Sequence, residues 1–199
     1  MKIVCLDVEG VLTPEIWIEF ARVSGIPALR RTTREEPDYD KLMAWRCQIL
    51  KEHGLGLREV QAVIEQIDPL PGALAFLDAL REKTEVILLS DTFREFARPL
   101  MKKLNHPTLF CNSLEVAPNG EILRHVMRIK NSKLATVKAL QSIGFEVVSV
   151  GDSYNDIDML LHSQAGILFR TTDEIRTRYP QLPALESYGE LLSAIEGAL

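Results

Sequence analysis

The first strand pattern of this chain ends directly in acidic residues, and this feature limits the fold more than any other. The apolar run at residues 2–6 leads into Asp7 and Glu9. A carboxylate at the end of a buried strand is costly unless a cation, a hydrogen-bond donor or a reaction uses its charge. The sequence therefore indicates a functional site where this strand ends.

Two later apolar runs end in the same way. Residues 86–89 lead into Ser90 and Asp91, and residues 147–150 lead into the polar segment 151–156. In open α/β sheets, ligands bind at the edge where the carboxyl ends of parallel strands meet. We therefore expect the three polar clusters to lie together at one edge of a sheet.

The order of the remaining patterns predicts an α/β fold with an insertion. Strand and helix patterns alternate over residues 71–199, which with residues 1–12 predict a doubly wound, Rossmann-like parallel sheet. Residues 13–70 carry only amphipathic helical patterns, so we predict an inserted helical cap after the first strand. A Pro-Asn-Gly turn at residues 118–120 predicts a β-hairpin within residues 114–129.

Local signals predict how two of these elements begin. Thr13 precedes a proline and has the chemistry of an N-cap for the first helix of the insertion. Residues 85–90 have a strand pattern and residues 93–104 a helical pattern. Ser90 is therefore predicted to lie where a strand turns into a helix.

Composition excludes several classes of partner. The net charge is −5 and no basic stripe is present, so nucleic acid is not an expected partner. No apolar run approaches the roughly 20 residues that span a bilayer, and Asp7 and Glu9 interrupt any signal peptide. The scattered Cys5, Cys47 and Cys111 predict reduced thiols in a cytoplasmic protein. The sequence leaves a homodimer open.

The residue types at the predicted edge suit phosphoryl transfer. Asp7 and Asp152 offer the oxygen ligands that Mg²⁺ prefers, and Asp7 is also a candidate nucleophile that would form an aspartyl-phosphate. Glu9, two residues further on, would protonate the leaving oxygen and later deprotonate the acceptor. Lys133 would add positive charge at the phosphate. Ser90 would bind phosphate oxygens with its hydroxyl and with free N–H groups at a helix start.

Taken in order, these motifs resemble those of the haloacid dehalogenase-type phosphohydrolases. The residues that carry the resemblance are Asp7-Val8-Glu9-Gly10, Ser90, Lys133 and Gly151-Asp152-Ser153-Tyr154-Asn155-Asp156. Within that superfamily the chain is most similar to phosphoserine phosphatases and to the bifunctional phosphoserine–homoserine phosphotransferases. The segments that suggest this are 6–12, 14–17, 37–40, 89–93 and 151–156. The resemblance covers nearly the whole chain.

The resemblance implies an Mg²⁺-dependent enzyme of serine and threonine biosynthesis. It would transfer the phosphoryl group of L-phosphoserine to homoserine or water. Asp7 and Asp152 would bind the metal through carboxylates and Glu9 through its backbone carbonyl. Asp156 would orient Lys133 or the waters on the metal.

The resemblance also implies how the substrate binds. Glu15 and Arg46 would hold the ammonium and carboxylate of phosphoserine, and a zwitterion does need one anion and one cation. Asn155 would lie at the phosphate or at the acceptor, and Asp91 would also be a substrate-binding residue. The insertion would act as a cap that closes over the site and excludes water.

Three departures from the general phosphatase pattern bear on the acceptor. Glu9 stands where Asp is usual, Val11 replaces a common Thr, and Asp91-Thr92 replaces glycines. These changes favour the phosphotransferase variant but leave water and homoserine both open as acceptors. The alternative is a phosphatase of the same superfamily for another small phosphate ester. The sequence disfavours a phospho-aspartate receiver domain. The acidic pair of a receiver precedes its phosphorylated Asp, whereas here Glu9 follows Asp7, and a receiver has no inserted cap.

Overall fold

The computed structural model describes residues 1–32, 35–36 and 38–199. The strands are β1 (Lys2–Leu6), β2 (Glu85–Phe93), β3 (Thr108–Val116), β4 (Ile122–Val126), β5 (Glu146–Gly151), β6 (Ala165–Phe169) and β7 (Ala184–Leu185). The helices are α1 (Ile16–Ser24), α2 (Tyr39–Glu52), α3 (Leu57–Ile64), α4 (Ala73–Arg81), α5 (Arg94–Lys103), α6 (Ser132–Ser142), α7 (Ile157–His162), α8 (Asp173–Arg178) and α9 (Tyr188–Ala198). Short 3₁₀ helices are η1 (Pro27–Arg30) and η2 (Tyr154–Asp156). Within the described residues, every helix is too short or too polar to span a bilayer.

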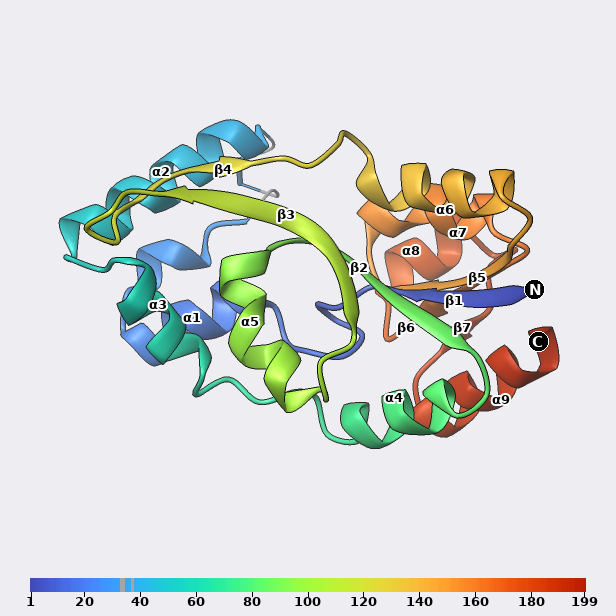
Figure 1. The fold of residues 1–199 in the computed structure, drawn as a ribbon. Helices are drawn as coiled ribbons and strands as arrows, with labels where there is room; N and C mark the ends of the chain where they lie inside the picture. Colours follow the sequence, from blue (N-terminus) through green and yellow to red (C-terminus); the bar gives the residue numbers. More distant parts are fainter. Residues whose placement is uncertain (33–34, 37) are drawn as a thin grey trace.

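The predicted doubly wound sheet is confirmed. The strand order is β4-β3-β2-β1-β5-β6-β7, and every neighbouring pair is parallel except β3 with β4. The central strand β1 is buried on both faces, as an apolar run in a parallel sheet must be. Its Val4 and Leu6 join the hydrophobic core beneath α4 and α9, while Ile3 and Cys5 join the core beneath α6 and α7. Figure 1 shows these two helical layers on opposite faces of the sheet.

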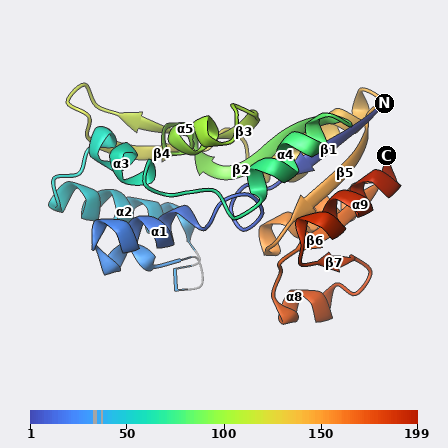
Figure 2. The ribbon, with the colours of Figure 1, turned by 90° about the horizontal axis from the view of Figure 1, so that it is seen from below.

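The β-hairpin is also confirmed, but it extends a core strand. The first part of β3 pairs with β2 in parallel, and its second part pairs with β4 antiparallel. Figure 2 shows the hairpin on the same side of the molecule as α2 and α3 of the insertion, and β4 contacts α2. Lys51 Nζ lies 2.7 Å from Glu121 of the hairpin, and the Leu57 N–H donates to the Gly120 carbonyl at 2.8 Å. The division into a core and a cap at residues 13–70 stays a prediction.

The predicted N-cap of the first insertion helix is wrong. Helix α1 begins at Ile16, and Glu15 occupies the N-cap position without a side-chain cap bond. Thr13 is buried, and its hydroxyl lies 3.4 Å from the Val8 carbonyl. Instead, Glu9 Oε2 accepts a hydrogen bond from the Ile16 N–H at 3.0 Å. A helix N-terminus favours a nearby carboxylate, so a residue distant in sequence supplies the cap.

The predicted strand end at Ser90 is also wrong. Strand β2 continues to Phe93, and α5 begins only at Arg94. The N-terminus of α5 therefore lies four residues beyond Ser90, and it does not support the helix-dipole argument for phosphate binding at Ser90. The pairing with β3 shifts register between Leu89 and Phe93. In that irregular stretch the Thr92 N–H donates to Ser90 Oγ at 3.1 Å.

Candidate active site

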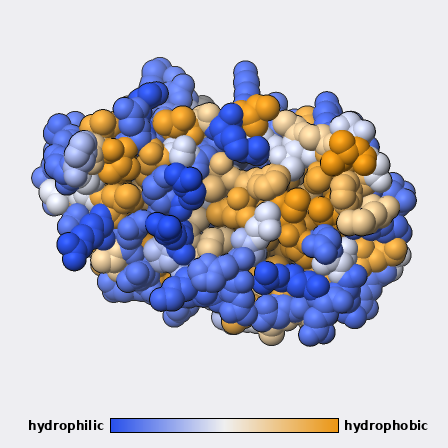
Figure 3. All heavy atoms as spheres, in the orientation of Figure 1, coloured by the Kyte–Doolittle hydropathy of each residue, from blue (hydrophilic) through white to orange (hydrophobic). Residues whose placement is uncertain are grey.

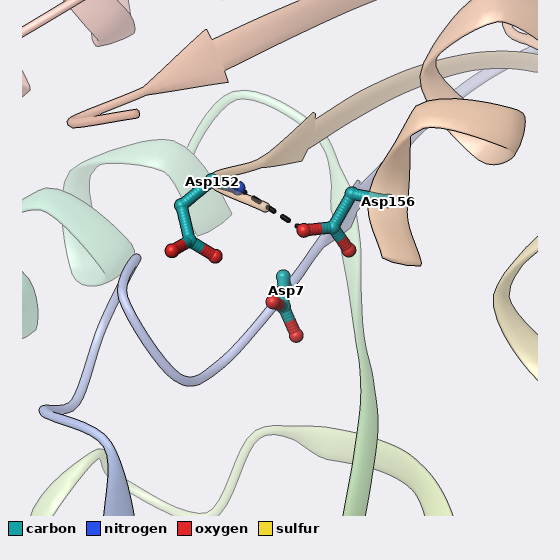
Figure 4. Close-up of side chains that lie close together, drawn as sticks. All are labelled: Asp7, Asp152 and Asp156. Carbon is teal, nitrogen blue, oxygen red and sulfur yellow. Dashed lines mark hydrogen bonds between the residues drawn. The ribbon is translucent and has the colours of Figure 1, made fainter. Parts of the chain in front are cut away.

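Three carboxylates converge where β1 and β5 end. Asp7 follows β1, and Asp152 and Asp156 follow β5. One oxygen from each lies within 4.8 Å of the others, and Figure 4 shows the three groups turned toward one another. Gly10 has φ +79°, and a Cβ at that position would stand 2.4 Å from the Asp152 carboxylate, so a glycine is needed there. This set of hard oxygen donors fits a divalent cation.

A buried lysine links two of the three carboxylates. Lys133 Nζ lies 2.9 Å from Asp7 Oδ1 and 2.7 Å from Asp156 Oδ1. Burial by itself would lower the pKa of Lys133, but the charges of Asp156 and Asp7 raise it above its usual range, so the ammonium stays charged. Asp156 Oδ2 accepts from the N–H groups of Asp152 and Ser153, both at 3.1 Å. Asp156 thus orients both Lys133 and the loop after β5.

The two oxygens of Asp7 differ in their surroundings. Oδ1 accepts from the Val8 N–H at 2.7 Å and faces Lys133 Nζ. Oδ2 has no hydrogen-bond donor among the residues that the structure describes. One oxygen is therefore fixed in place, and the other remains available for a cation or an electrophile.

The site carries more negative than positive charge. Burial, and then the charge of Asp156, raises the pKa of Asp7 well above its usual range. Burial, followed by the charges of Asp156 and Glu15, raises the pKa of Asp152 to about 7. Burial and the charge of Glu15 raise the pKa of Glu9 to about 8. Glu9 is therefore largely protonated at neutral pH and is able to donate a proton.

The insertion contributes a buried cation to this region. Arg46 on α2 is 5% exposed, its Nη2 donates to the Arg31 carbonyl at 2.7 Å, and its guanidinium lies 4.4 Å from the centre of the Trp17 ring. Burial lowers its pKa to about 10, which keeps it charged at neutral pH. Its Nε has no hydrogen-bond partner among the described residues. Glu15 is exposed at the start of α1, and its charge and that of Glu9 both act on Arg46.

Asp91 connects three segments around the site. Its Oδ2 accepts from Asn155 Nδ2 at 3.0 Å, and its Oδ1 lies 3.4 Å from Ser132 Oγ. Asn155 Oδ1 accepts from Ser153 Oγ at 2.6 Å, so the Asn155 amide is held at both ends. The structure thus brings Asp91 and Asn155 together, while Ser90 is buried beside them in β2.

A cavity of about 290 Å³ adjoins these residues, and sequence reasoning missed most of its wall. Tyr39, Asp91, Lys130, Lys133 and Asn155 are among the residues that line it. Tyr39 lies in segment 37–40, which carries part of the resemblance, but it was given no role. Lys130 has no motif of its own, and the available signal was its position just before α6, the helix that carries Lys133.

Comparisons with known proteins agree with this geometry. The family model described as haloacid dehalogenase-like hydrolase matches residues 1–163. The chain is 49% identical to "Phosphoserine phosphatase ThrH" of Pseudomonas aeruginosa, over 96% of this chain and 93% of that protein. It is 48% identical to "Phosphoserine phosphatase" of Pseudomonas syringae pv. tomato, over 96% and 81%. A solved phosphoserine phosphatase in its apo form has the same fold, with a TM-score of 0.71 and 22% identity over 93% of this chain and 92% of that chain.

Proposed function

This chain belongs to the haloacid dehalogenase-like hydrolases, and from that premise we propose that it transfers the phosphoryl group of L-phosphoserine through Asp7. The acceptor is homoserine or water. The observation that carries the proposal is the buried Asp7, whose Oδ1 is fixed by Lys133 while its Oδ2 is left without a donor. The names of the two relatives at 48% and 49% identity support phosphoserine as the substrate.

In the first half-reaction, Asp7 Oδ2 attacks the phosphorus atom and the bond from phosphorus to the serine oxygen breaks. Glu9 donates its proton to that oxygen, which its raised pKa of about 8 allows at neutral pH. Lys133 offsets the charge that gathers on the phosphoryl oxygens. The products are serine and an aspartyl-phosphate.

In the second half-reaction, Glu9 takes the proton from the acceptor hydroxyl. The acceptor oxygen attacks phosphorus, and the bond from phosphorus to Asp7 breaks. The product is phosphate when water attacks, or phosphohomoserine when homoserine attacks. Asp7 returns to its carboxylate form and Glu9 to its acid form, so the cycle is complete.

We propose that Mg²⁺ is held by the carboxylates of Asp7 and Asp152 and by the Glu9 backbone carbonyl. Asp156 lies in the same cluster, but both of its oxygens already accept hydrogen bonds, one from Lys133 and one from backbone N–H groups. When bound, the cation would neutralise part of the charge on the transferring phosphoryl group.

Arg46 and Glu15 are our candidates for binding the amino-acid part of phosphoserine. Arg46 is buried and charged, and it has a free Nε–H donor, which suits a carboxylate. Glu15 carries the opposite charge, and that charge acts on Arg46. Residues 13–70, which carry both side chains, would form a cap that excludes water during transfer. We also propose a cytoplasmic location, because Cys5, Cys47 and Cys111 are all free thiols.

Phosphorus NMR of the protein with phosphoserine, homoserine and Mg²⁺ tests this function. We expect phosphoserine to be consumed and phosphohomoserine, phosphate or both to form. Asp7→Asn abolishes turnover, and Arg46→Met raises the KM for phosphoserine far more than Arg30→Met, a matched change at an exposed arginine of the same insertion. Turnover of p-nitrophenyl phosphate but not of phosphoserine would reject the substrate and favour another small phosphate ester.

A further inference from the structure

The cavity beside the active site has a size and position suited to a second small molecule. Its volume of about 290 Å³ is close to the roughly 300 Å³ at which small-molecule pockets begin. Lys133 forms part of its wall, and Lys133 Nζ is 2.9 Å from Asp7 Oδ1. Lys133 therefore belongs both to the cavity wall and to the ion pair with the nucleophile. Neither Glu15 nor Arg46 lines it.

The negative side of the cavity is a fixed carboxylate. Asn155 and Ser132 donate to the two oxygens of Asp91, which are thereby held in position. An ionised carboxylate has about four lone-pair sites, so Asp91 keeps the capacity to accept further donors. This is the geometry expected of a preorganised binding group rather than of a mobile surface acid.

The positive side of the cavity is Lys130. This exposed lysine makes no ion pair with any residue that the structure describes. Met127 and Tyr39 supply apolar surface on the same wall. The cavity therefore has an anion, a cation and a surface for methylene groups, which together match a zwitterionic amino acid with a short side chain.

Tyr39 connects the cavity to the proposed acid–base group. Burial raises the pKa of Tyr39; the charge of Arg46 opposes this rise, and the charges of Glu9 and Asp91 add to it. The charges of Glu9 and Asp91 thus both act on a side chain of the cavity wall. Lys133, in the same wall, contacts the nucleophile Asp7 directly.

We propose that this cavity is the acceptor subsite, and that it takes an amino acid with a primary hydroxyl group, whose ammonium binds Asp91 and whose carboxylate binds Lys130. The inference rests on the proposed function. The acceptor oxygen forms a bond to phosphorus as the bond from phosphorus to Asp7 breaks, and the hydroxyl proton passes to Glu9. Donor and acceptor are then recognised by different charge pairs.

Acceptor analogues test the two charged contacts separately. Homoserine carries both charges, 4-hydroxybutyrate lacks the ammonium, and 3-amino-1-propanol lacks the carboxylate. Phosphorus NMR measures the phosphorylated acceptor against phosphate for the wild type, Asp91→Asn and Lys130→Met. Asp91→Asn keeps the shape of the side chain and an oxygen for Asn155 but removes the charge.

We expect Asp91→Asn to raise the half-saturating concentration of homoserine and of 3-amino-1-propanol roughly tenfold or more, as loss of a charged hydrogen bond does. With 4-hydroxybutyrate the change stays small. Lys130→Met gives the complementary pattern, with its loss confined to the acceptors that carry a carboxylate. Lys138→Met, at an exposed lysine of α6 outside the cavity, leaves all three acceptors as in the wild type.

Two results would overturn the subsite. Equal losses for all three acceptors in Asp91→Asn would mean that Asp91 acts only by positioning Asn155. Release of phosphate alone at saturating homoserine would reject the subsite while leaving a phosphoserine phosphatase. Absence of any phosphoserine turnover would instead reject the proposed function. In that case, calorimetric binding of homoserine to the wild type and to Asp91→Asn still decides whether the cavity is an amino-acid site.

Discussion

Replacing Lys133 with methionine isolates the energetic role of the buried charge cluster. The side chain of Lys133 is 4% exposed, and its partners Asp7 and Asp156 are 6% and 0% exposed. Methionine has a similar length but no charge, so both carboxylates lose their cation. Removing one partner of a buried ion pair costs about 3–5 kcal/mol, because an uncompensated charge stays buried. We expect the free energy of unfolding to fall by that amount at about pH 8.

The loss should depend on pH in a definite direction. Without Lys133, the pKa of Asp7 rises further above its unfolded value, because the cation that lowers it is gone. The native state then binds more protons than the unfolded chain between those two pKa values, so its stability falls as pH rises. At about pH 5 more of the carboxyl groups are neutral, and the cost of Lys133→Met should be smaller.

Urea unfolding followed by far-UV circular dichroism, in the presence of EDTA, measures this cost at both pH values. Lys138→Met on the same helix is the control, and it should change stability by less than about 0.5 kcal/mol. Adding Asp156→Asn to Lys133→Met should recover part of the loss, since one stranded charge is removed. A loss below about 1 kcal/mol that does not vary with pH would refute this account of the cluster.

Three further predictions concern the same region and the thiols. Gly10→Ala should cost at least about 1–2 kcal/mol in unfolding free energy and weaken Mg²⁺ binding measured by calorimetry, because φ is +79° and the new Cβ meets the Asp152 carboxylate. Burial and neighbouring charges raise the pKa of Asp152 to about 7 and that of Glu9 to about 8, so in EDTA the Tm should fall from about pH 5 to about pH 8. Mg²⁺ should raise the Tm more at the higher pH, and an equal increase at both would contradict this. Burial raises the pKa of the Cys111 thiol to about 11, so mass spectrometry should show slow alkylation by iodoacetamide at neutral pH that speeds up as pH increases.

The parallel sheet and its acidic edge could be predicted because the signals are local. The apolar run at residues 2–6 and the Asp7 that follows it are enough by themselves to predict a buried strand with a functional site at its end. The same holds for Asp152, and the structure places both carboxylates in one cluster. The place of Asp156 beside Lys133 was expected only through the family resemblance, because the position of its side chain depends on how the loop after β5 turns back.

The errors arise where partners distant in sequence decide the local structure. Ser90 and Thr92 have the chemistry of helix caps, but pairing of Phe93 with Asn112 keeps this segment in the sheet. Glu9 caps α1 through a contact that only the folded turn between them creates. Secondary-structure propensity depends on residues that are neighbours in the sequence, so it could not predict either contact.

The pairing of the hairpin with the helical insertion limits how this enzyme can be recombined with its relatives. Asp40 Oδ1 lies 2.8 Å from His125 Nε2, and Gly120 and Glu121 bind residues near the end of α2 and the start of α3. These contacts therefore join the predicted cap at residues 13–70 to a second piece of chain at the tip of β3 and β4. A chimaera that exchanges only the first piece would leave these contacts without partners, whereas one that moves both pieces would keep them.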